Sequence, residues 1–250
     1  MPRLLPLLLL LLCACGGGAE RPEPLRVHAA ASLRDLFAEL GSEFEARHGV
    51  PLRLTTGGSN LIANQVLAGA PADVLVSASA LEVERLVEAG LVPASGVREL
   101  FGNALVVVVP EGAPGVETSV EVLLQGARRL SLAHPRAVPA GRYARAWLVE
   151  LGLWDELEQR TLAGMDVRAA LAAVASGGAD VGVVYRTDAM ASEGVRVVHE
   201  VPAAGVRYAG GVLADSERPE LARQFLDLCS GADAEGRAIL EAHGFLLLGE

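Results

Sequence analysis

The chain contains no lysine, only three cysteines and five scattered histidines, and each shortage excludes a class of function. A nucleotide-binding loop of the form Gly-x-x-x-x-Gly-Lys-Ser/Thr requires a lysine, so the chain has no such loop. A metal cation requires clustered His, Cys or carboxylate ligands, which the scattered histidines do not provide. We therefore expect no metal site and no cofactor, and any energy for the protein's activity must come from a partner.

Cysteine is almost absent from the part of the chain that folds. Cys13 and Cys15 lie close to the N-terminus, which leaves Cys229 as the only later thiol. A single thiol cannot form an internal disulfide, so stability must come from a hydrophobic core, for which 250 residues with 51% hydrophobic content are sufficient. We expect Cys229 to be a packed helix residue.

Positive charge is also scarce, because 21 arginines face 31 acidic residues and the net charge is −10. Nucleic acids and anionic membrane surfaces favour basic proteins, so neither is an expected partner. An anionic ligand would have to be held by local groups, since the overall charge does not attract it.

The N-terminus has the pattern of a secretory signal. Arg3 precedes a leucine-rich run over 4–12, which is shorter than the ~20 apolar residues of a membrane span. Leu12-Cys13-Ala14-Cys15 resembles a bacterial lipobox, which implies cleavage before Cys15 and a lipid on its sulfur. We predict a signal peptide over 1–14 and a polar tether over 15–24. An ordinary signal cut elsewhere is the alternative, and both predict export to the periplasm or the outer cell surface.

From residue 25 onward, short apolar runs alternate with patterns of helical spacing, which predicts an α/β fold with mostly parallel sheets covered by helices. The predicted strands are 25–29, 50–55, 72–78, 105–110, 130–133 and 181–185. The predicted helices are 32–48, 59–67, 80–89, 143–151, 167–176, 219–229 and 232–243.

The β-forming run 105–110 marks a crossing into a second lobe. The last two predicted helices have no strand of their own to cover, so we place them back on the first lobe. The sequence thus predicts lobe I over 25–103 and 207–250 and lobe II over 104–206. Two lobes joined by two crossings form a hinge with a cleft between them.

Two turns carry serines at points where a strand ends and a helix begins. Ser32 follows Ala29-Ala30-Ala31, and Ser59 follows Gly57-Gly58. The first N–H groups of a helix lack partners, so a hydroxyl beside them can help to hold an anion without a cation. The simpler interpretation is that each serine caps the N-terminus of its helix.

Five motifs, in this order, resemble those of periplasmic molybdate-binding proteins of ABC transporters, which are type II solute-binding proteins. They are Ala29-Ala30-Ala31-Ser32-Leu33, Gly69-Ala70-Pro71-Ala72-Asp73-Val74, Val138-Pro139-Ala140-Gly141-Arg142-Tyr143-Ala144, Asp166-Val167-Arg168-Ala169-Ala170-Leu171 and Gly182-Val183-Val184-Tyr185. The resemblance implies a two-lobed periplasmic-binding-protein-like fold (type II). It further implies capture of molybdate or tungstate in the interlobe cleft, delivery to a membrane permease with a separate ATPase, and no enzymatic activity.

The resemblance also implies which residues bind the oxyanion. They are Ser32, Ser59, Ala140, Val167 and Tyr185. Hydroxyls and backbone N–H groups are neutral donors, which suit a fully deprotonated dianion. The turn 55–60 has fewer serines than the family pattern, and we expect Ser59 rather than Thr56 to donate from it. Without the other motifs, Tyr185 would be interpreted as a core residue.

Other interpretations stay open at this point. A carrier of sulfate, phosphate or another oxyanion would use the same plan, and we expect a monomer in each case. A secreted serine hydrolase is disfavoured because Gly57-Gly58-Ser59-Asn60-Leu61 departs from Gly-x-Ser-x-Gly. Asp73 and Asp166 are expected to cap a helix or fix a loop. Arg168 is expected either to lie behind the residues that touch the anion or to pair with an acidic side chain.

Overall fold

The computed structural model describes residues 22–115 and 119–248. The predicted signal peptide over 1–14 lies outside the described residues, as do Cys15 and all of the tether except its last three residues. Within the described ranges, no helix is both long enough and apolar enough to cross a membrane.

Strands and helices alternate along the chain, as predicted. The strands are β1 (Leu25–Ala30), β2 (Leu52–Gly57), β3 (Val74–Ser77), β4 (Arg98–Pro110), β5 (Leu130–Ala133), β6 (Thr161–Gly164), β7 (Val181–Tyr185) and β8 (Val195–Val212). The helices are α1 (Arg34–His48), α2 (Ser59–Leu67), α3 (Ala80–Glu88), α4 (Val120–Gly126), α5 (Pro139–Glu150), α6 (Trp154–Leu157), α7 (Val167–Ala175), α8 (Arg186–Met190), α9 (Pro219–Cys229) and α10 (Ala234–Ala242). A short 3-10 helix, Ala31–Leu33, precedes α1.

The described strands form one sheet in the order β2-β1-β3-β8-β4-β7-β5-β6. Strands β1, β2 and β3 are parallel to one another, and so are β5, β6 and β7. Between these two groups run the long strands β4 and β8, which pair antiparallel with each other and with their outer neighbours. The two parallel groups are thus joined through β4 and β8.

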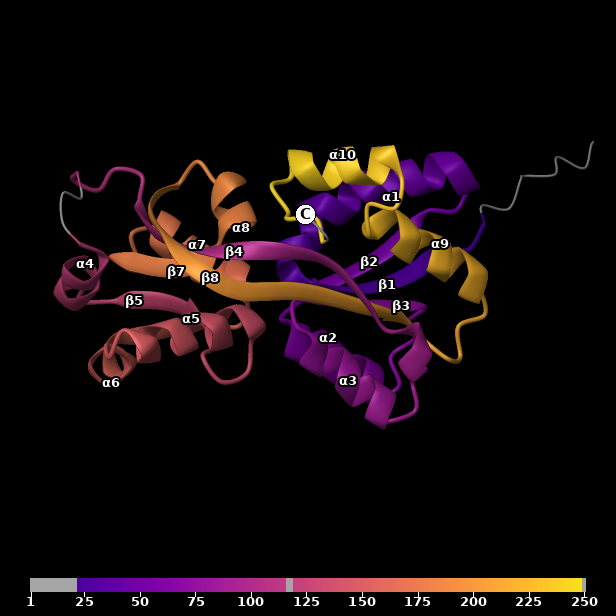
Figure 1. Cartoon of the computed structure of the whole chain (residues 1–250), viewed down its shortest axis with the longest axis horizontal. Helices are drawn as coiled ribbons and strands as arrows, with labels where there is room; N and C mark the ends of the chain where they lie inside the picture. The colour runs from indigo at the N-terminus through magenta and orange to yellow at the C-terminus, as the bar shows by residue number, and fades with distance from the viewer. Residues whose placement is uncertain (1–21, 116–118, 249–250) are drawn as a thin grey trace, which may run out of the picture.

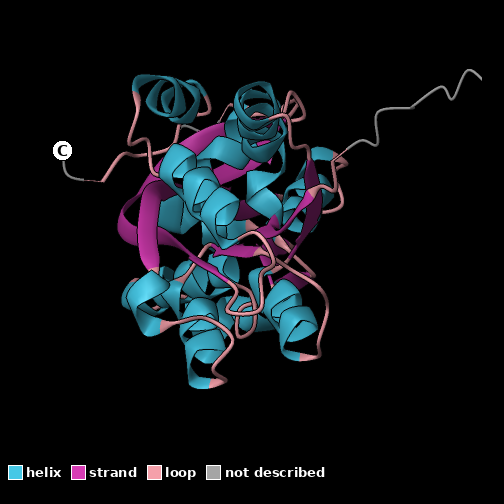
Figure 2. Cartoon of the chain, turned by 90° about the vertical axis from the view of Figure 1, so that its right-hand side faces the viewer, coloured by secondary structure: helices cyan, strands magenta, loops and turns pink. Residues whose placement is uncertain are grey.

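Figure 1 shows that the molecule has two halves bridged by β4 and β8. We call β1–β3 with α1–α3, α9 and α10 the first lobe, and β5–β7 with α4–α8 the second lobe. Helices cover both faces of the sheet (Figure 2). The predicted boundaries between the lobes follow Asn103 in β4 and Val206 in β8. These two residues lie opposite each other in the pairing of the two strands, so the two boundaries are adjacent in the sheet. The exact lobe limits stay a prediction.

Aromatic packing fixes helix α9 to the first lobe. The ring of Phe225 in α9 meets Phe37 and Phe44 of α1 edge to face, with centroids 5.3 and 5.5 Å apart. Cys229 at the end of α9 is fully buried, as predicted for a packed helix residue. Burial raises the pKa of its thiol well above the ordinary value, so the thiol stays protonated and unreactive.

The sequence pattern missed several short elements and the pairing of the two long strands. The sequence pattern did not indicate α4, α6, α8 or β6, which are short, nor the long strand β8. Strand β4 begins at Arg98, seven residues before the predicted start, because its early residues pair with the end of β8. Pairing between strands that are far apart in sequence decides these bounds, and local spacing does not record it.

Helix α5 begins in unusually close contact with the preceding strand. A Cβ added to Gly141 would lie 2.1 Å from the carbonyl oxygen of Ala133 and 2.6 Å from that of His134. A glycine inside a helix normally costs about 0.5–1 kcal/mol relative to alanine. The close approach gives this glycine its role, which is to let the first turn of α5 lie directly against the end of β5.

We expect Gly141→Ala to lower the free energy of unfolding by about 1–3 kcal/mol, because backbone atoms must move to admit the methyl group. The matched control is Gly126→Ala, also within a helix, where a Cβ would meet no atom within 4 Å. Urea unfolding of both variants checks this prediction. Equal stability of the two variants would contradict the close contact.

Candidate functional site

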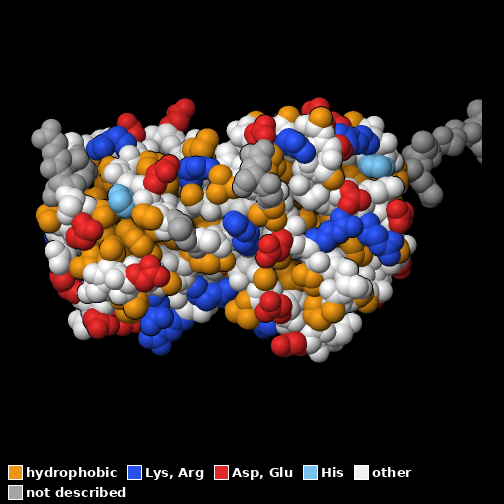
Figure 3. Space-filling model, in the orientation of Figure 1, with side chains coloured by type: hydrophobic (Ala, Val, Ile, Leu, Met, Phe, Trp, Pro, Cys, Tyr) orange, Lys and Arg blue, Asp and Glu red, His pale blue; other side chains and the backbone are white. Residues whose placement is uncertain are grey.

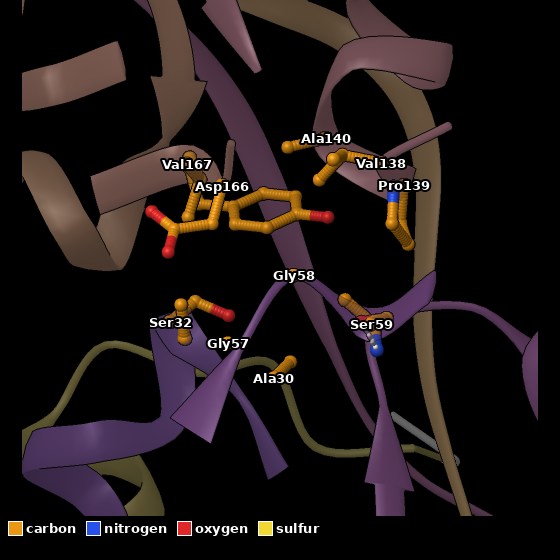
Figure 4. Close-up of a pocket in the computed structure, with 13 residues that line it drawn as sticks. Ala30, Ser32, Gly57, Gly58, Ser59, Val138, Pro139, Ala140, Asp166 and Val167 are labelled. Carbon is orange, nitrogen blue, oxygen red and sulfur yellow. Dashed lines mark hydrogen bonds between the residues drawn. The ribbon is translucent and has the colours of Figure 1, made fainter. Parts of the chain in front are cut away.

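A small pocket lies between the two lobes. Figure 3 shows notches between the two halves, and Figure 4 shows the pocket residues from both sides. All five sequence-predicted binding residues line this pocket. The full lining is Ala30, Ala31, Ser32, Gly57, Gly58, Ser59, Ala78, Val138, Pro139, Ala140, Asp166, Val167 and Tyr185.

Three helices begin at this pocket. Ser59 is the first residue of α2, Ala140 the second of α5 and Val167 the first of α7. The first N–H groups of each helix have no partner within the helix, and the helix dipole adds partial positive charge there. In Figure 4, Val138–Ala140 and Val167 face Ser32, Gly57 and Ser59 across the pocket. Helix N-termini from both lobes thus converge on one point, as suits an anion.

The hydroxyl of Ser59 is held as a donor toward the pocket. Its Oγ accepts a hydrogen bond of 3.1 Å from the backbone N–H of Ala78, so its own proton stays available. Ser59 does not cap α2, because Gly58 occupies the N-cap position. Thr56 does not line the pocket. The preference for Ser59 over Thr56 therefore agrees with the geometry.

Ser32 lies in the 3-10 helix after β1, and it also makes no cap. Its Oγ lies 2.8 Å from the hydroxyl oxygen of Tyr208, and both side chains are buried. The simple N-cap interpretation of the two serines is therefore wrong: each side chain is bonded to a residue distant in sequence. The partner of Ser32 carries no local signal in the sequence, since 176 positions separate the two residues.

Tyr185 contributes the third hydroxyl. Its side chain is 1% exposed, and its hydroxyl has no hydrogen-bond partner among the described residues. Burial raises the pKa of this phenol well above 10, so the group remains a proton donor at neutral pH. A buried hydroxyl without a partner is costly. Tyr185 lines the pocket, so its hydroxyl is available there as a hydrogen-bond donor.

The single charged residue in the described lining is Asp166. It occupies the N-cap of α7, and its Oδ1 accepts a hydrogen bond of 2.8 Å from the N–H of Ala169, as predicted. In Figure 4 its carboxylate points away from Gly58. None of the described lining residues is basic, and the described residues hold no group of three or more His, Cys, Asp or Glu suited to a metal. The pocket offers neutral donors to an anion.

Gly58 explains why this turn has fewer serines than expected. A Cβ at Gly58 would lie 2.8 Å from the backbone oxygen of Met165, which belongs to the second lobe. The two lobes therefore meet backbone to backbone at the rim of the pocket. A serine at this position would hold them apart.

One ion pair between the lobes flanks the pocket at α3 and α5. Arg142 donates from Nη1 to Oε1 of Glu82 at 2.9 Å and from Nη2 to Oε2 at 3.2 Å. Glu82 is 1% exposed and also accepts from the hydroxyl of Ser77 at 3.3 Å. Arg142 donates further to Ser79 Oγ at 3.2 Å. A nearly buried carboxylate of the first lobe is thus neutralised by an arginine of the second.

A second ion pair between the lobes joins α1 and α7. Arg168 donates from Nη2 to Oδ2 of Asp35 at 2.6 Å, and its Nε contacts the carboxylate of Asp188 in α8. Arg168 does not line the pocket, so of its two expected roles it has the pairing one. Burial of Asp188 raises its pKa to about 7, even though Arg168 opposes the shift.

Asp73 has the loop-fixing role expected of it. Its carboxylate accepts from the side chain of Arg26 at 2.9 Å, from the backbone N–H of Arg26 at 2.8 Å and from the hydroxyl of Ser216 at 2.8 Å. These bonds tie β1 to the segments before β3 and α9. They lower the pKa of this carboxyl in spite of its desolvation.

Comparison with known proteins agrees with this geometry. The model of the bacterial extracellular solute-binding protein family matches residues 25–246. The molybdate-binding protein ModA of Escherichia coli (strain K12) is 33% identical over 94% of this chain and 93% of its own length. YvgL of Bacillus subtilis (strain 168), named as an ABC transporter substrate-binding lipoprotein, is 32% identical over 91% of this chain and 88% of its own length.

A solved structure shows the same fold. The periplasmic molybdate-binding protein of Azotobacter vinelandii superposes with a TM-score of 0.79 at 24% identity, over 89% of this chain and 99% of that structure. This likeness confirms the expected two-lobed type II architecture. With the family model matching nearly all of the described chain, the protein belongs to the bacterial extracellular solute-binding protein family.

Proposed function

We propose that this protein captures molybdate, and also tungstate, between its two lobes. The observation that carries the proposal is the set of donors: three buried hydroxyls and the N-termini of α2, α5 and α7 converge on one pocket whose described lining has no basic residue. A buried ion whose oxygens all accept hydrogen bonds is stabilised by oriented dipoles alone. A tetrahedral dianion has only acceptor oxygens and matches such a pocket.

The proposed binding residues are Ser32, Ser59 and Tyr185 through their hydroxyls, and Ala140 and Val167 through their backbone N–H groups. The names of the relatives support molybdate as the ligand. As a member of this family the chain is a solute-binding protein and not an enzyme, which removes the serine hydrolase alternative. Sulfate or phosphate would use similar donors, so the choice of oxyanion depends on pocket size and on the ligand's proton.

We further propose that the closed, loaded protein delivers its anion to an ABC permease driven by a separate ATPase. In this proposal the protein acts as a monomer outside the cytoplasm and is anchored by a lipid on Cys15. A relative named as a lipoprotein supports the anchor. The complete donor set exists only when the lobes meet, so the ligand favours the closed form.

Isothermal titration with molybdate, tungstate, sulfate and phosphate at neutral pH tests the proposed function. We expect tight one-to-one binding of molybdate and tungstate, and no heat from the other two anions. Binding of sulfate or phosphate alone would support the anion site but show that the transported ion is not molybdate. The absence of measurable binding of all four anions would overturn the proposal.

We expect Tyr185→Phe to weaken molybdate binding by about 10- to 100-fold, because the variant loses one charge-assisted hydrogen bond of about 1.5–3 kcal/mol. Thermal unfolding of the ligand-free variant should stay at or above the wild-type temperature, since the hydroxyl has no partner among the described residues. Titration calorimetry and thermal unfolding check the two parts. Loss of stability together with unchanged affinity would show that Tyr185 is a core residue only.

We expect Arg142→Ala to weaken molybdate binding by about tenfold or more, because closing the lobes would then bury Glu82 without its partner. The matched control is Arg136→Ala. Its pair with Glu158 lies within the second lobe, and Arg136 is 72% exposed, so affinity should not change. Titration calorimetry measures both variants, and small-angle scattering reports closure. Equal affinities would show that this ion pair does not favour the closed form.

A further inference from the structure

A chain of buried hydrogen bonds leads from the backbone between the lobes to the pocket hydroxyl of Ser32. Asn103 of β4 donates from Nδ2 to the hydroxyl oxygen of Tyr208 in β8 at 3.3 Å, and Tyr208 lies 2.8 Å from Ser32 Oγ. All three side chains are at most 4% exposed. Tyr208 and Asn103 do not line the pocket, so they act on a ligand only through Ser32.

The direction of this chain is fixed at its far end. Oδ1 of Asn103 accepts a hydrogen bond of 2.8 Å from the backbone N–H of Ala104, which is always a donor. The other amide atom must therefore be the NH₂ group. Its two hydrogens go to Thr187 Oγ1 at 2.9 Å and to the hydroxyl oxygen of Tyr208.

Tyr208 must then pass its own proton to Ser32. Its oxygen accepts from Asn103, and burial raises the pKa of the phenol far above 10, so the proton remains on the group. The ring is packed against Phe101 and Phe245, with centroids 4.9 and 5.7 Å away, which holds its hydroxyl oxygen between Asn103 and Ser32. Ser32 Oγ accepts that proton, which leaves the proton of Ser32 to point at the pocket.

We propose that Asn103 and Tyr208 are positioning residues that hold Ser32 as a hydrogen-bond donor toward the ligand in the pocket. This inference rests on the proposed function. While Tyr208 donates to Ser32 Oγ, the proton of Ser32 is directed away from Tyr208 and is available to the ligand. Ser59 is held in the same way by the N–H of Ala78, so both serines have a fixed role.

A double-mutant cycle between Tyr208→Phe and Ser32→Ala tests this inference with molybdate. Tyr208→Phe alone should weaken binding by about tenfold, the effect of one hydrogen bond. In the Ser32→Ala background the same change should alter affinity by less than about twofold, because Tyr208 acts through Ser32. A merely structural role would give the same loss in both backgrounds and would overturn the inference.

The matched control is Tyr143→Phe, which removes another mostly buried phenol hydroxyl close to the cleft. No hydrogen bond joins Tyr143 to Ser32 or to Tyr208 among the described residues. Its effect on affinity should be equal in both backgrounds. Asn103→Ala gives a second route if Tyr208→Phe folds poorly: it leaves Tyr208 in place and should show a smaller loss that also disappears in the Ser32→Ala background.

If wild-type protein bound none of the four anions, the proposed function would fail and this inference with it, whereas tight wild-type binding with additive losses would overturn this inference alone.

Discussion

The proposed anion site places one electrostatic constraint on the structure, which is that a doubly charged ligand has to be held by neutral groups. Without a basic side chain in the described lining, every donor has to be present and correctly oriented. Backbone N–H groups at helix N-termini are donors by nature. Hydroxyls can both donate and accept, so each has to be committed to the role of donor by its surroundings. Ser59 is committed by the N–H of Ala78, Ser32 by Tyr208, and Tyr185 by its protonation in a buried position.

The arrangement of the lobes follows from the same constraint. No single lobe supplies the whole of the proposed donor set, because the serines belong to the first lobe, and Ala140, Val167 and Tyr185 to the second. The basic side chains instead lie outside the pocket, where Arg142 and Arg168 pair with carboxylates across the cleft. Positive charge thus contributes to joining the lobes, while the proposed donors to the anion are all neutral.

Much of this could be predicted from the sequence, because it depends on local patterns. The serine turns after β1 and β2, the helix starts at α5 and α7 and the final tyrosine of β7 all carry recognisable motifs, and the pocket brings together every residue they indicated. The contacts that orient these residues could not be predicted. Tyr208, Asn103 and Glu82 act across long stretches of chain, and their sequence surroundings are those of ordinary strand and helix residues.

The contact between Gly58 and the carbonyl oxygen of Met165 has a consequence for how ligand size is sensed. Side chains at a pocket wall can rotate to admit a larger guest, but two backbone segments in contact cannot. An anion with longer bonds to oxygen would therefore separate the lobes instead of being absorbed by local adjustment. A larger ion would then change the distance between the two lobe surfaces. A permease that contacts both lobes could distinguish ions by that distance.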